Sequence, residues 1–218
     1  EHIQANLGGK LISAHEDQRK AIARELHDDL SQRLTRLSID ATIIGSKLED
    51  KQNSSSMEKL RRDLVEVSKD VHDMSYWLHP SILDDLGLES ALRSEVEQIS
   101  RHCDAELVVK IHTLDEPITP DAALCIFRVA QEALQNCIRH ANASRVELEL
   151  TQEHGSLRLT VSDNGSGFST VDKDDRVGIG LSSMSERAKL LGSRLKVRSA
   201  PGQGTIIEVS IPSDGVNP

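Results

Sequence analysis

A histidine followed directly by a carboxylate stands in the first part of the chain, inside a long helical pattern. The pair is His27-Asp28, and Gln32 follows about one turn later. An imidazole nitrogen carries a lone pair that attacks electrophiles, and a neighbouring carboxylate can bind the other ring nitrogen and fix the tautomer. We therefore interpret His27 as the residue acted upon. A solvated surface pair is the alternative that this segment alone leaves open.

Three polar residues share one face of a later helical pattern. They are Glu132, Asn136 and His140, and side chains four residues apart lie on the same side of a helix. Carboxylate and amide oxygens suit Mg²⁺, which takes one or two protein oxygens and completes its shell with phosphate oxygens and water. A solvated face would not favour asparagine in mid-helix, where it is a poor helix former. This face is therefore a candidate magnesium site.

Glycines gather in three further places, each at the end of a predicted strand or helix. Gly165 and Gly167 follow Asp163 after a strand, Gly178 and Gly180 open a helix at Leu181, and Gly202-Gln203-Gly204-Thr205 precedes the last strand. Glycine lets the backbone approach a phosphate closely, and a helix N-terminus adds N–H donors and a favourable dipole. A single Gly-x-Gly pair is a weak signal. The conjunction and order of these stretches after the asparagine helix are specific.

The histidine lies on a predicted helical hairpin. Residues 7–48 form one long helix pattern, the polar cluster 51–56 predicts a turn, and a second helix stops at His79-Pro80. Around Leu26 the apolar spacing is four and four, a stutter that puts His27 roughly 80° from the apolar direction and within reach of solvent. The apolar seams are Leu30, Leu34, Leu37, Ala41, Ile44 and Leu48, then Leu60, Leu64, Val67, Val71, Met74 and Leu78.

These two seams predict a partner. A hairpin of this length cannot bury both seams by itself, so a second copy that completes a four-helix bundle is the economical solution. We therefore expect a homodimer through residues 7–79. The alternative is burial of the seams against the rest of the chain.

The second part of the chain changes period and predicts an α+β fold, with one mixed sheet and helices on one face. Alternating apolar residues predict the strands, and stretches of 3.6-residue period predict the helices. We expect a helical hairpin domain at 1–80, a connector at 81–87 and a second domain at 88–213. Its expected helices are 88–103, 121–141 and 181–191, and its expected strands are 106–114, 145–151, 157–161, 194–199 and 205–211.

Composition narrows the function classes. The 218 residues carry a net charge of −9, with only two Phe, one Tyr and one Trp, so we expect neither base stacking nor binding to phosphate backbones. Three cysteines without CxxC spacing are typical of a reducing compartment such as the cytoplasm, and they predict no structural metal site. No apolar run approaches the roughly 18 residues of a membrane span, so we expect no membrane contact. The start at Glu1, without an initiating Met, suggests a fragment of a longer protein.

The second domain resembles the ATP-binding domain of the GHKL superfamily, with its N box, its two glycine boxes and the final Gly-Gln-Gly-Thr motif. The first domain resembles the dimerisation and phosphoacceptor domain of NarX-like and DesK-like sensor histidine kinases, which carry His-Asp-x-x-x-Gln. Together the resemblance covers about residues 13–212. It implies a dimeric four-helix bundle followed by a GHKL-type α/β sandwich.

The resemblance also implies roles. Asp163 would accept a hydrogen bond from the adenine amino group, Thr205 would help to hold the ring, Asn136 would bind Mg²⁺, and Glu132 would stand near the metal and its waters. The glycines at 165, 167, 178 and 180, with Leu181, would delimit a short lid over the phosphates of ATP. Lys173 and Arg176 lie inside that lid, where phosphate contact and simple solvation both remain open.

The activity implied is autophosphorylation of His27 from Mg·ATP, helped by Asp28, followed by transfer to an aspartate of a response-regulator receiver domain. Gln32 would position water for dephosphorylation of that regulator. One rival is a nucleotide-gated interaction module in which His27 is never phosphorylated. Another is a GHKL ATPase of the repair or chaperone kind, which the histidine hairpin and the short lid disfavour.

Overall fold

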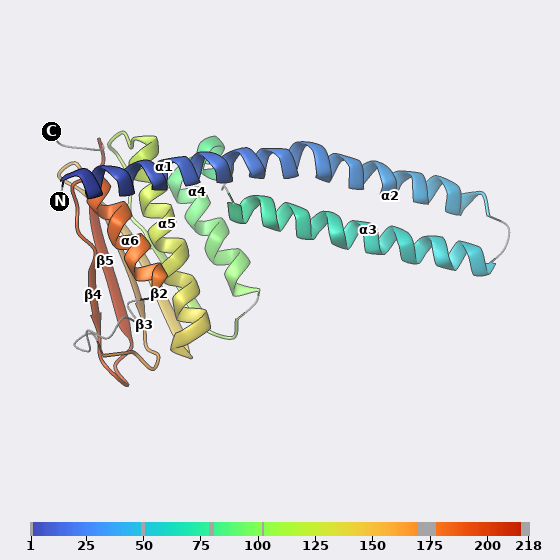
Figure 1. Ribbon diagram of the computed structural model, residues 1–218. Coiled ribbons are helices and arrows are strands. Elements are labelled where there is room, and N and C mark those ends of the chain that lie inside the picture. The colour runs from blue at the N-terminus through green and yellow to red at the C-terminus, as the bar shows by residue number, and fades with distance from the viewer. Residues whose placement is uncertain (1, 49–50, 79–80, 102, 170–177, 215–218) are drawn as a thin grey trace. The chain divides into compact units, whose positions relative to one another are not determined.

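The computed structural model describes residues 2–48, 51–78, 81–101, 103–169 and 178–214 (Figure 1). The chain divides into two compact units. One comprises Lys10–Ser81, and the other comprises Glu1–Gly9 and Ile82–Pro218. Within the described part of the chain, no helix combines the length and the hydropathy that a membrane-spanning helix needs.

The first unit is a helical hairpin. Its first arm is nearly continuous, with α1 (His2–Glu25), a five-residue π-helical segment η1 (Leu26–Leu30) and α2 (Ser31–Ser46). The return arm is α3 (Lys51–Leu78), which runs back beside α2 (Figure 1). The predicted long helix is thus confirmed, apart from the π-helical segment and an end two residues earlier than Leu48. The predicted stop at His79-Pro80 lies outside the described residues.

Small side chains let the two arms of the hairpin approach closely. Ala23, Ala41 and Val71 are buried, and the Ser75 hydroxyl donates to the carbonyl of Ala23 at 2.7 Å. This contact sets the register of the antiparallel arms near His27. Other apolar residues of the hairpin are exposed, among them Ile22, Ile39, Ile43 and Val65. Six of the exposed apolar residues form rows that repeat every seven residues along each arm: Leu30, Leu37, Ile44, Leu60, Val67 and Met74.

The prediction of a turn at residues 51–56 is wrong, because α3 already begins at Lys51. Serine is tolerated there because Ser56 donates its hydroxyl to the carbonyl of Gln52 at 3.0 Å, one turn back. Met57 also packs against Gly45 of α2, where an added Cβ would lie 3.1 Å from the Met57 side chain. Packing between the arms therefore outweighs the weak helix propensity of the serine cluster.

The second unit alternates helices and strands. Its helical part contains α4 (Ser81–Ser100), α5 (Pro120–Asn136), a second π-helical segment η2 (Cys137–Ala141) and α6 (Ile179–Leu190). Its strands are β1 (Glu106–Ile111), β2 (Arg145–Glu153), β3 (Ser156–Asp163), β4 (Lys196–Ser199) and β5 (Thr205–Pro212).

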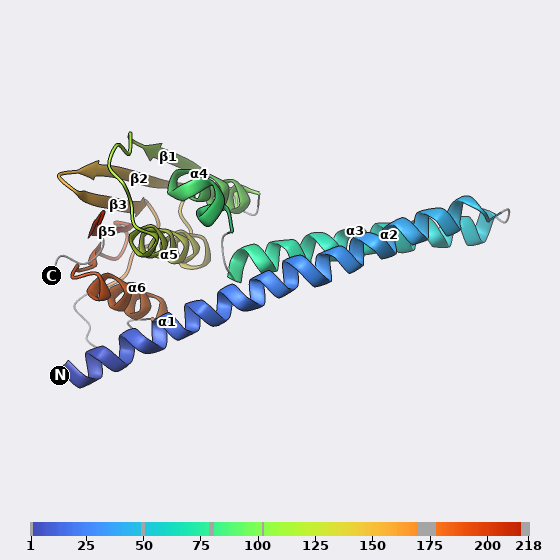
Figure 2. The same cartoon turned by 90° about the horizontal axis from the view of Figure 1, so that it is seen from above.

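The five strands form one mixed sheet in the order β1-β2-β3-β5-β4. β1 pairs parallel to β2, and the other pairs are antiparallel. The helices α4, α5 and α6 cover the same face of the sheet (Figure 2), so the expected fold is confirmed. Alternate residues of the central strands point into the core: Val146, Leu148 and Leu150, then Leu157, Leu159 and Val161, then Ile207, Val209 and Ile211.

Several boundaries differ from the prediction, and two of them have a clear physical reason. The expected connector 81–87 is helical as far as Leu86, and Gly87, with φ of 78° and ψ of 179°, interrupts α4 at the point where the prediction started the helix. Only glycine adopts this conformation without strain. The strand predicted to reach Leu114 ends at Ile111, because its ladder with β2 ends at the Ile111–Leu150 pair.

A polar network lies inside the core between α4 and α5. Arg128 donates to the Gln131 side-chain oxygen at 2.8 Å, and the Gln131 amide nitrogen donates to both Glu95 oxygens at 3.4 Å. Glu95 is only 1% exposed. Burial raises the pKa of Glu95 to about 7, against the opposing effects of the Gln131 hydrogen bond and the Arg128 charge.

Candidate functional site

The phosphoacceptor candidate His27 is exposed on the hairpin, within the π-helical segment η1. Its ring faces His72 on α3, with ring centroids 5.6 Å apart and planes inclined at 53°. The predicted accessibility of His27 is therefore confirmed. The contact with His72 was not predicted, because a single histidine in the second helix pattern carries no signal by itself.

Asp28 and Gln32 are both exposed beside His27. In the described hairpin no hydrogen bond joins Asp28 to His27, since neighbouring residues of a helix point in different directions. Asp29 instead pairs with Arg33 at 2.8 Å, one turn further on. The roles expected of Asp28 and Gln32 therefore stay predictions.

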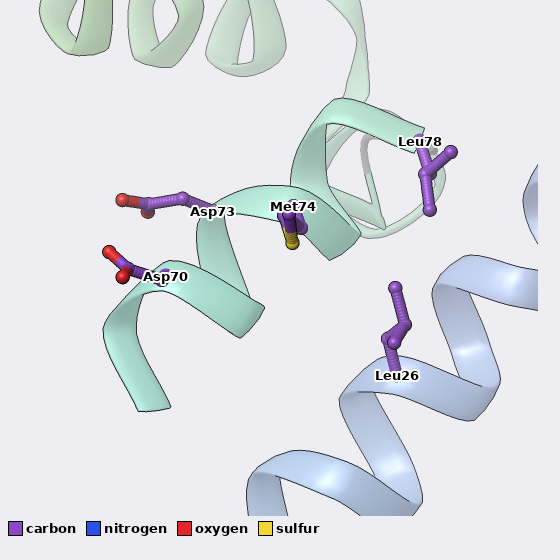
Figure 3. A pocket seen from close by; sticks show the side chains of 5 residues that line it. All are labelled: Leu26, Asp70, Asp73, Met74 and Leu78. Carbon is purple, nitrogen blue, oxygen red and sulfur yellow. The ribbon is translucent and has the colours of Figure 1, made fainter. Parts of the chain in front are cut away.

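A shallow hollow opens between the arms next to His27. Its floor is apolar, with Leu26 from η1 and Met74 and Leu78 from α3, and its edge carries the carboxylates of Asp70 and Asp73. Figure 3 shows these two carboxylates side by side on α3, pointing away from Leu26. The hollow therefore has an apolar floor and an acidic edge.

In the second unit, Asp163 and Thr205 meet at one end of the sheet. Asp163 is the last residue of β3 and pairs across the ladder with Thr205, the first residue of β5. The Asp163 carboxylate is already held on both oxygens. The Gly165 N–H donates to one at 2.8 Å, and the Cys137 thiol donates to the other at 3.5 Å.

Cys137 is the unexpected member of this group. It lies at the start of the π-helical segment η2 and is buried. Burial, followed by the nearby Asp163 carboxylate, raises the pKa of the Cys137 thiol far above its ordinary value. The sulfur therefore stays a neutral S–H donor. A cysteine within an apolar stripe reads as core in a sequence, so its contact with Asp163 could not be predicted.

The first loop, which follows β3, contains Gly165 and Gly167. Both must be glycine because other backbone segments lie close to them. A Cβ on Gly165 would overlap the Ala141 carbonyl, and Gly167, with φ of 57°, leaves no room for one beside the Ala200 carbonyl. The Gly204 N–H donates to the Gly165 carbonyl at 3.0 Å. The first loop thus rests against both η2 and the segment before β5.

The adjoining residues hold this arrangement in place. Asn164 accepts hydrogen bonds on its side-chain oxygen from the backbone N–H groups of Ser144 and Arg145, both at 3.0 Å. The Ser199 hydroxyl lies 3.0 Å from the Thr205 hydroxyl and donates to the Gly204 carbonyl at 2.9 Å. Thr205 is therefore oriented by β4. The sequence did not single out Ser199, because serine in a strand has many ordinary uses.

Glu132 reaches from α5 to the start of α6. A Cβ added to Gly180 would overlap the Glu132 carboxylate, so glycine is needed there to admit this side chain. Asn136 lies one turn beyond Glu132 and is half-buried. Thr119 starts α5 by accepting a hydrogen bond from Ala122, with Pro120 at the first helical position. The apolar face of α5 lies in the core, where Phe127, Ala130 and Leu134 are buried.

The lid is described only at its two ends. Gly178 caps α6 with its backbone, and Leu181 packs against the hydrophobic core. Lys173 and Arg176 lie outside the described residues. The four predicted motifs therefore converge at one end of the sheet through direct contacts: Cys137 with Asp163, Glu132 with Gly180, and Gly204 with Gly165.

The residues at this end of the sheet fit a magnesium ion that also binds phosphate. Glu132 and Asn136 supply a carboxylate and an amide oxygen one turn apart on α5, and Mg²⁺ needs only one or two protein oxygens when phosphates complete its shell. Among the described residues, no group of three or more His, Cys, Asp and Glu side chains could hold a metal ion by itself. The fit therefore depends on a phosphate-bearing ligand.

Comparisons with known proteins match the two parts of the chain to two protein families. Residues 18–83 match a histidine kinase family, and residues 122–215 match the family of histidine kinase-, DNA gyrase B- and HSP90-like ATPases. A histidine-bearing helical domain followed by an ATPase domain of this kind defines a histidine kinase core. The chain belongs to the sensor histidine kinases of the NarX-like type.

Named relatives cover most of the chain. The oxygen sensor histidine kinase NreB of Staphylococcus carnosus is 30% identical over 209 residues, which are 96% of this chain and 60% of that protein. The chain thus spans about three fifths of the relative's length. The histidine kinase domain of a blue-light activated histidine kinase from Erythrobacter litoralis has the same fold, with a TM-score of 0.52, 20% identity, and coverage of 84% of this chain and 95% of that domain.

Proposed function

We propose that the chain is the cytoplasmic transmitter core of a two-component sensor histidine kinase. It would bind Mg·ATP in the second unit, phosphorylate His27 and pass the phosphoryl group to an aspartate of a response-regulator receiver domain. The observation that carries this proposal is the convergence of the four nucleotide motifs at one end of the sheet, in a chain that also presents an exposed histidine.

Different residues of the second unit would bind different parts of the nucleotide. Asp163 accepts a hydrogen bond from the adenine amino group, with Thr205 beside it. Glycines 165, 167, 178 and 180 admit the phosphates, and Leu181 anchors the lid. Asn136 would hold magnesium, and Glu132 would stand near the ion and its waters. When bound, the ion offsets negative charge on the phosphates.

At His27 the lone pair of one ring nitrogen forms the bond to the γ-phosphorus while the bond to the leaving oxygen breaks and ADP takes those electrons. The ring would be left cationic, so the proton on its other nitrogen must depart. Asp28 is the neighbouring carboxylate that can take this proton after a change of side-chain rotamer. The exposed apolar residues of the hairpin support a homodimer, in which a second copy covers them.

Two substitutions test the proposal together. His27→Gln should abolish labelling by [γ-³²P]ATP and leave ATP affinity nearly unchanged. Asp163→Asn should weaken ATP binding by about tenfold or more, because one acceptor aimed at adenine is lost, while the hairpin stays folded. Both effects are measured on the same preparations by acid- and base-stability of the label and by calorimetric ATP titration.

The rival reading, a nucleotide-gated interaction module, requires that wild-type protein binds ATP and acquires no acid-labile label. Retained labelling of His27→Gln would place the acceptor elsewhere. Equal competition by GTP and ATP for the wild-type protein would remove the assignment of Asp163 to adenine.

Gln32 is proposed to act in the reverse direction. It is exposed on the first turn of α2, and its amide can both donate to and accept from a water that attacks the phospho-aspartate of a docked regulator. Gln32→Ala should therefore lose phosphatase activity, about tenfold or more, and keep autophosphorylation. A parallel fall of both activities would make Gln32 structural, and an unchanged phosphatase activity would assign that reaction to other groups.

A further inference from the structure

His72 contacts the proposed acceptor and has no assigned role. It is exposed on α3, and its ring packs against His27 with centroids 5.6 Å apart. Both rings belong to the helical unit, and their register is set by the buried hydrogen bond from Ser75 to Ala23 at 2.7 Å. The two imidazoles are therefore brought together by the packing of the hairpin.

The surroundings of His27 oppose an incoming phosphoryl group. Asp28 and Asp29 follow His27 directly in the same π-helical segment, and Asp70 and Asp73 lie within two residues of His72 on α3. A phosphohistidine carries up to two negative charges near neutral pH. Repulsion by these carboxylates would raise the free energy of the phosphorylated state unless a positive donor lies within reach.

The basic side chains nearby are placed less favourably than His72. Arg33 is engaged by Asp29 at 2.8 Å. Arg24 and Lys69 lie one turn before His27 and His72 respectively, and both are exposed. His72 differs because its ring is in contact with the His27 ring, and imidazole accepts a proton near physiological pH.

We propose that His72 stabilises the phosphoryl group on His27, donating a ring N–H to a phosphoryl oxygen and supplying a positive charge. This inference rests on the proposed function of His27. His72 makes no covalent bond in the reaction. A charge-assisted hydrogen bond of this kind is stronger than a neutral one, and it would also disfavour protonation of the phosphorylated ring, the step that leads to hydrolysis.

The test compares His72→Ala, His72→Gln and His72→Arg in the full chain, with His15→Ala as control. His15 is an exposed histidine on α1 of the same unit. Each protein is labelled with [γ-³²P]ATP, freed of nucleotide, and followed for loss of label. We expect His72→Ala to shorten the phosphohistidine half-life and slow labelling by about fivefold or more, with the ATP KM unchanged. His72→Arg should restore most of the half-life, and His15→Ala should match wild type.

A second measurement separates this role from a structural one. The ³¹P NMR signal of phospho-His27 reports the pH at which the phosphorylated imidazole ring loses its proton, and a neighbouring positive charge lowers that pH. His72→Ala should raise this midpoint by about 0.5 pH unit. If His72→Ala does not fold, judged by circular dichroism, His72→Gln takes its place, since glutamine keeps a donor without the charge.

The outcomes distinguish the two proposals. If the His72→Ala variant has the same phosphohistidine half-life, labelling rate and ³¹P midpoint as wild type, the inference is overturned and the kinase proposal stands. Absence of label in wild-type protein would overturn the kinase proposal itself. If His72→Gln abolishes the label and His27→Gln retains it, the acceptor is His72, and the roles assigned to both residues are wrong.

Discussion

Asp163 is oriented before any nucleotide arrives. Its two carboxylate oxygens accept from the Gly165 N–H and from the Cys137 thiol, so little conformational entropy remains to be lost when adenine binds. The two donors use one lone pair on each oxygen, and a carboxylate has roughly four acceptor positions. Orientation by the protein and recognition of a ligand are therefore compatible in one side chain.

Glu95 makes the stability of the second unit depend on pH. Its pKa is raised by burial to about 7, so the folded state binds a proton that the unfolded state releases at lower pH. Stability from this group is fully present below the unfolded pKa and is lost as pH rises towards 7. Glu95→Gln should remove this loss. The free energy of unfolding of the variant, relative to that of wild type, should therefore increase by about 2 kcal/mol between pH 5 and pH 8.

Urea unfolding followed by circular dichroism at the two pH values measures this difference. Glu97→Gln is the matched control, because Glu97 is an exposed residue of the same helix that pairs with Arg101. The Glu97 variant should follow the pH profile of wild type. Parallel profiles for Glu95→Gln and wild type would show that Glu95 stays ionised in the folded state.

At the scale of elements, alternation and glycine placement predicted most of the second unit. Buried and more exposed residues alternate along β2, β3 and β5 because one face of the sheet is buried and the other faces solvent. Gly165 and Gly204 were recognisable because close backbone contacts tolerate no Cβ. The asparagine helix was recognisable because its polar face interrupts an otherwise apolar helix.

Other features could not be read from the sequence, since they depend on partners distant along the chain. The helical start at Lys51 depends on packing against α2, and the buried pair Glu95 and Gln131 looks like a pair of surface residues until the two helices meet. The stutter at Leu26 did indicate a local irregularity. It could not show that the irregularity is a π-helical turn, because a stutter in the apolar spacing is also compatible with a continuous α-helix.

Gly180 and Glu132 provide a test of the contact between α6 and α5. Gly180→Ala should displace the Glu132 carboxylate, because the new Cβ would occupy its position. The labelling rate should fall by about tenfold or more, with normal circular dichroism, since only the end of a flexible side chain has to move. Ser182→Ala, at an exposed position of the same helix, is the control. An unchanged rate in Gly180→Ala would show that the Glu132 position is unimportant.

At the scale of the whole molecule, the exposed apolar stripe of the hairpin predicts assembly. Leu37 is 51% exposed and Val67 is 45% exposed, and both belong to rows that repeat every seven residues, the spacing of helical bundles. Leu37→Glu with Val67→Glu should raise the dimer dissociation constant by about 100-fold or more, because charge would be placed in an apolar interface.

Sedimentation equilibrium measures that constant. Ile39→Glu is the matched control: Ile39 is 54% exposed on the same helix but lies outside the seven-residue rows, so its variant should dimerise like wild type. Dissociation of all three variants alike would mean that the interface lies on another face. A monomeric wild-type protein would contradict the assembly altogether.

The π-helical segment Leu26–Leu30 has a further consequence for the way the first arm turns about its own axis. The extra residue in this turn corresponds to about 100° of rotation and about 1.5 Å of rise in a regular helix. The side chains before Leu26 are therefore rotated about the helix axis relative to those of α2 by a fixed angle. Deleting one residue here, such as Asp29, would regularise the helix and turn His27 relative to α2 and its contacts with α3. The segment thus acts as an angular offset, so that a rotation of the first arm about its own axis at this point changes the direction in which His27 is presented.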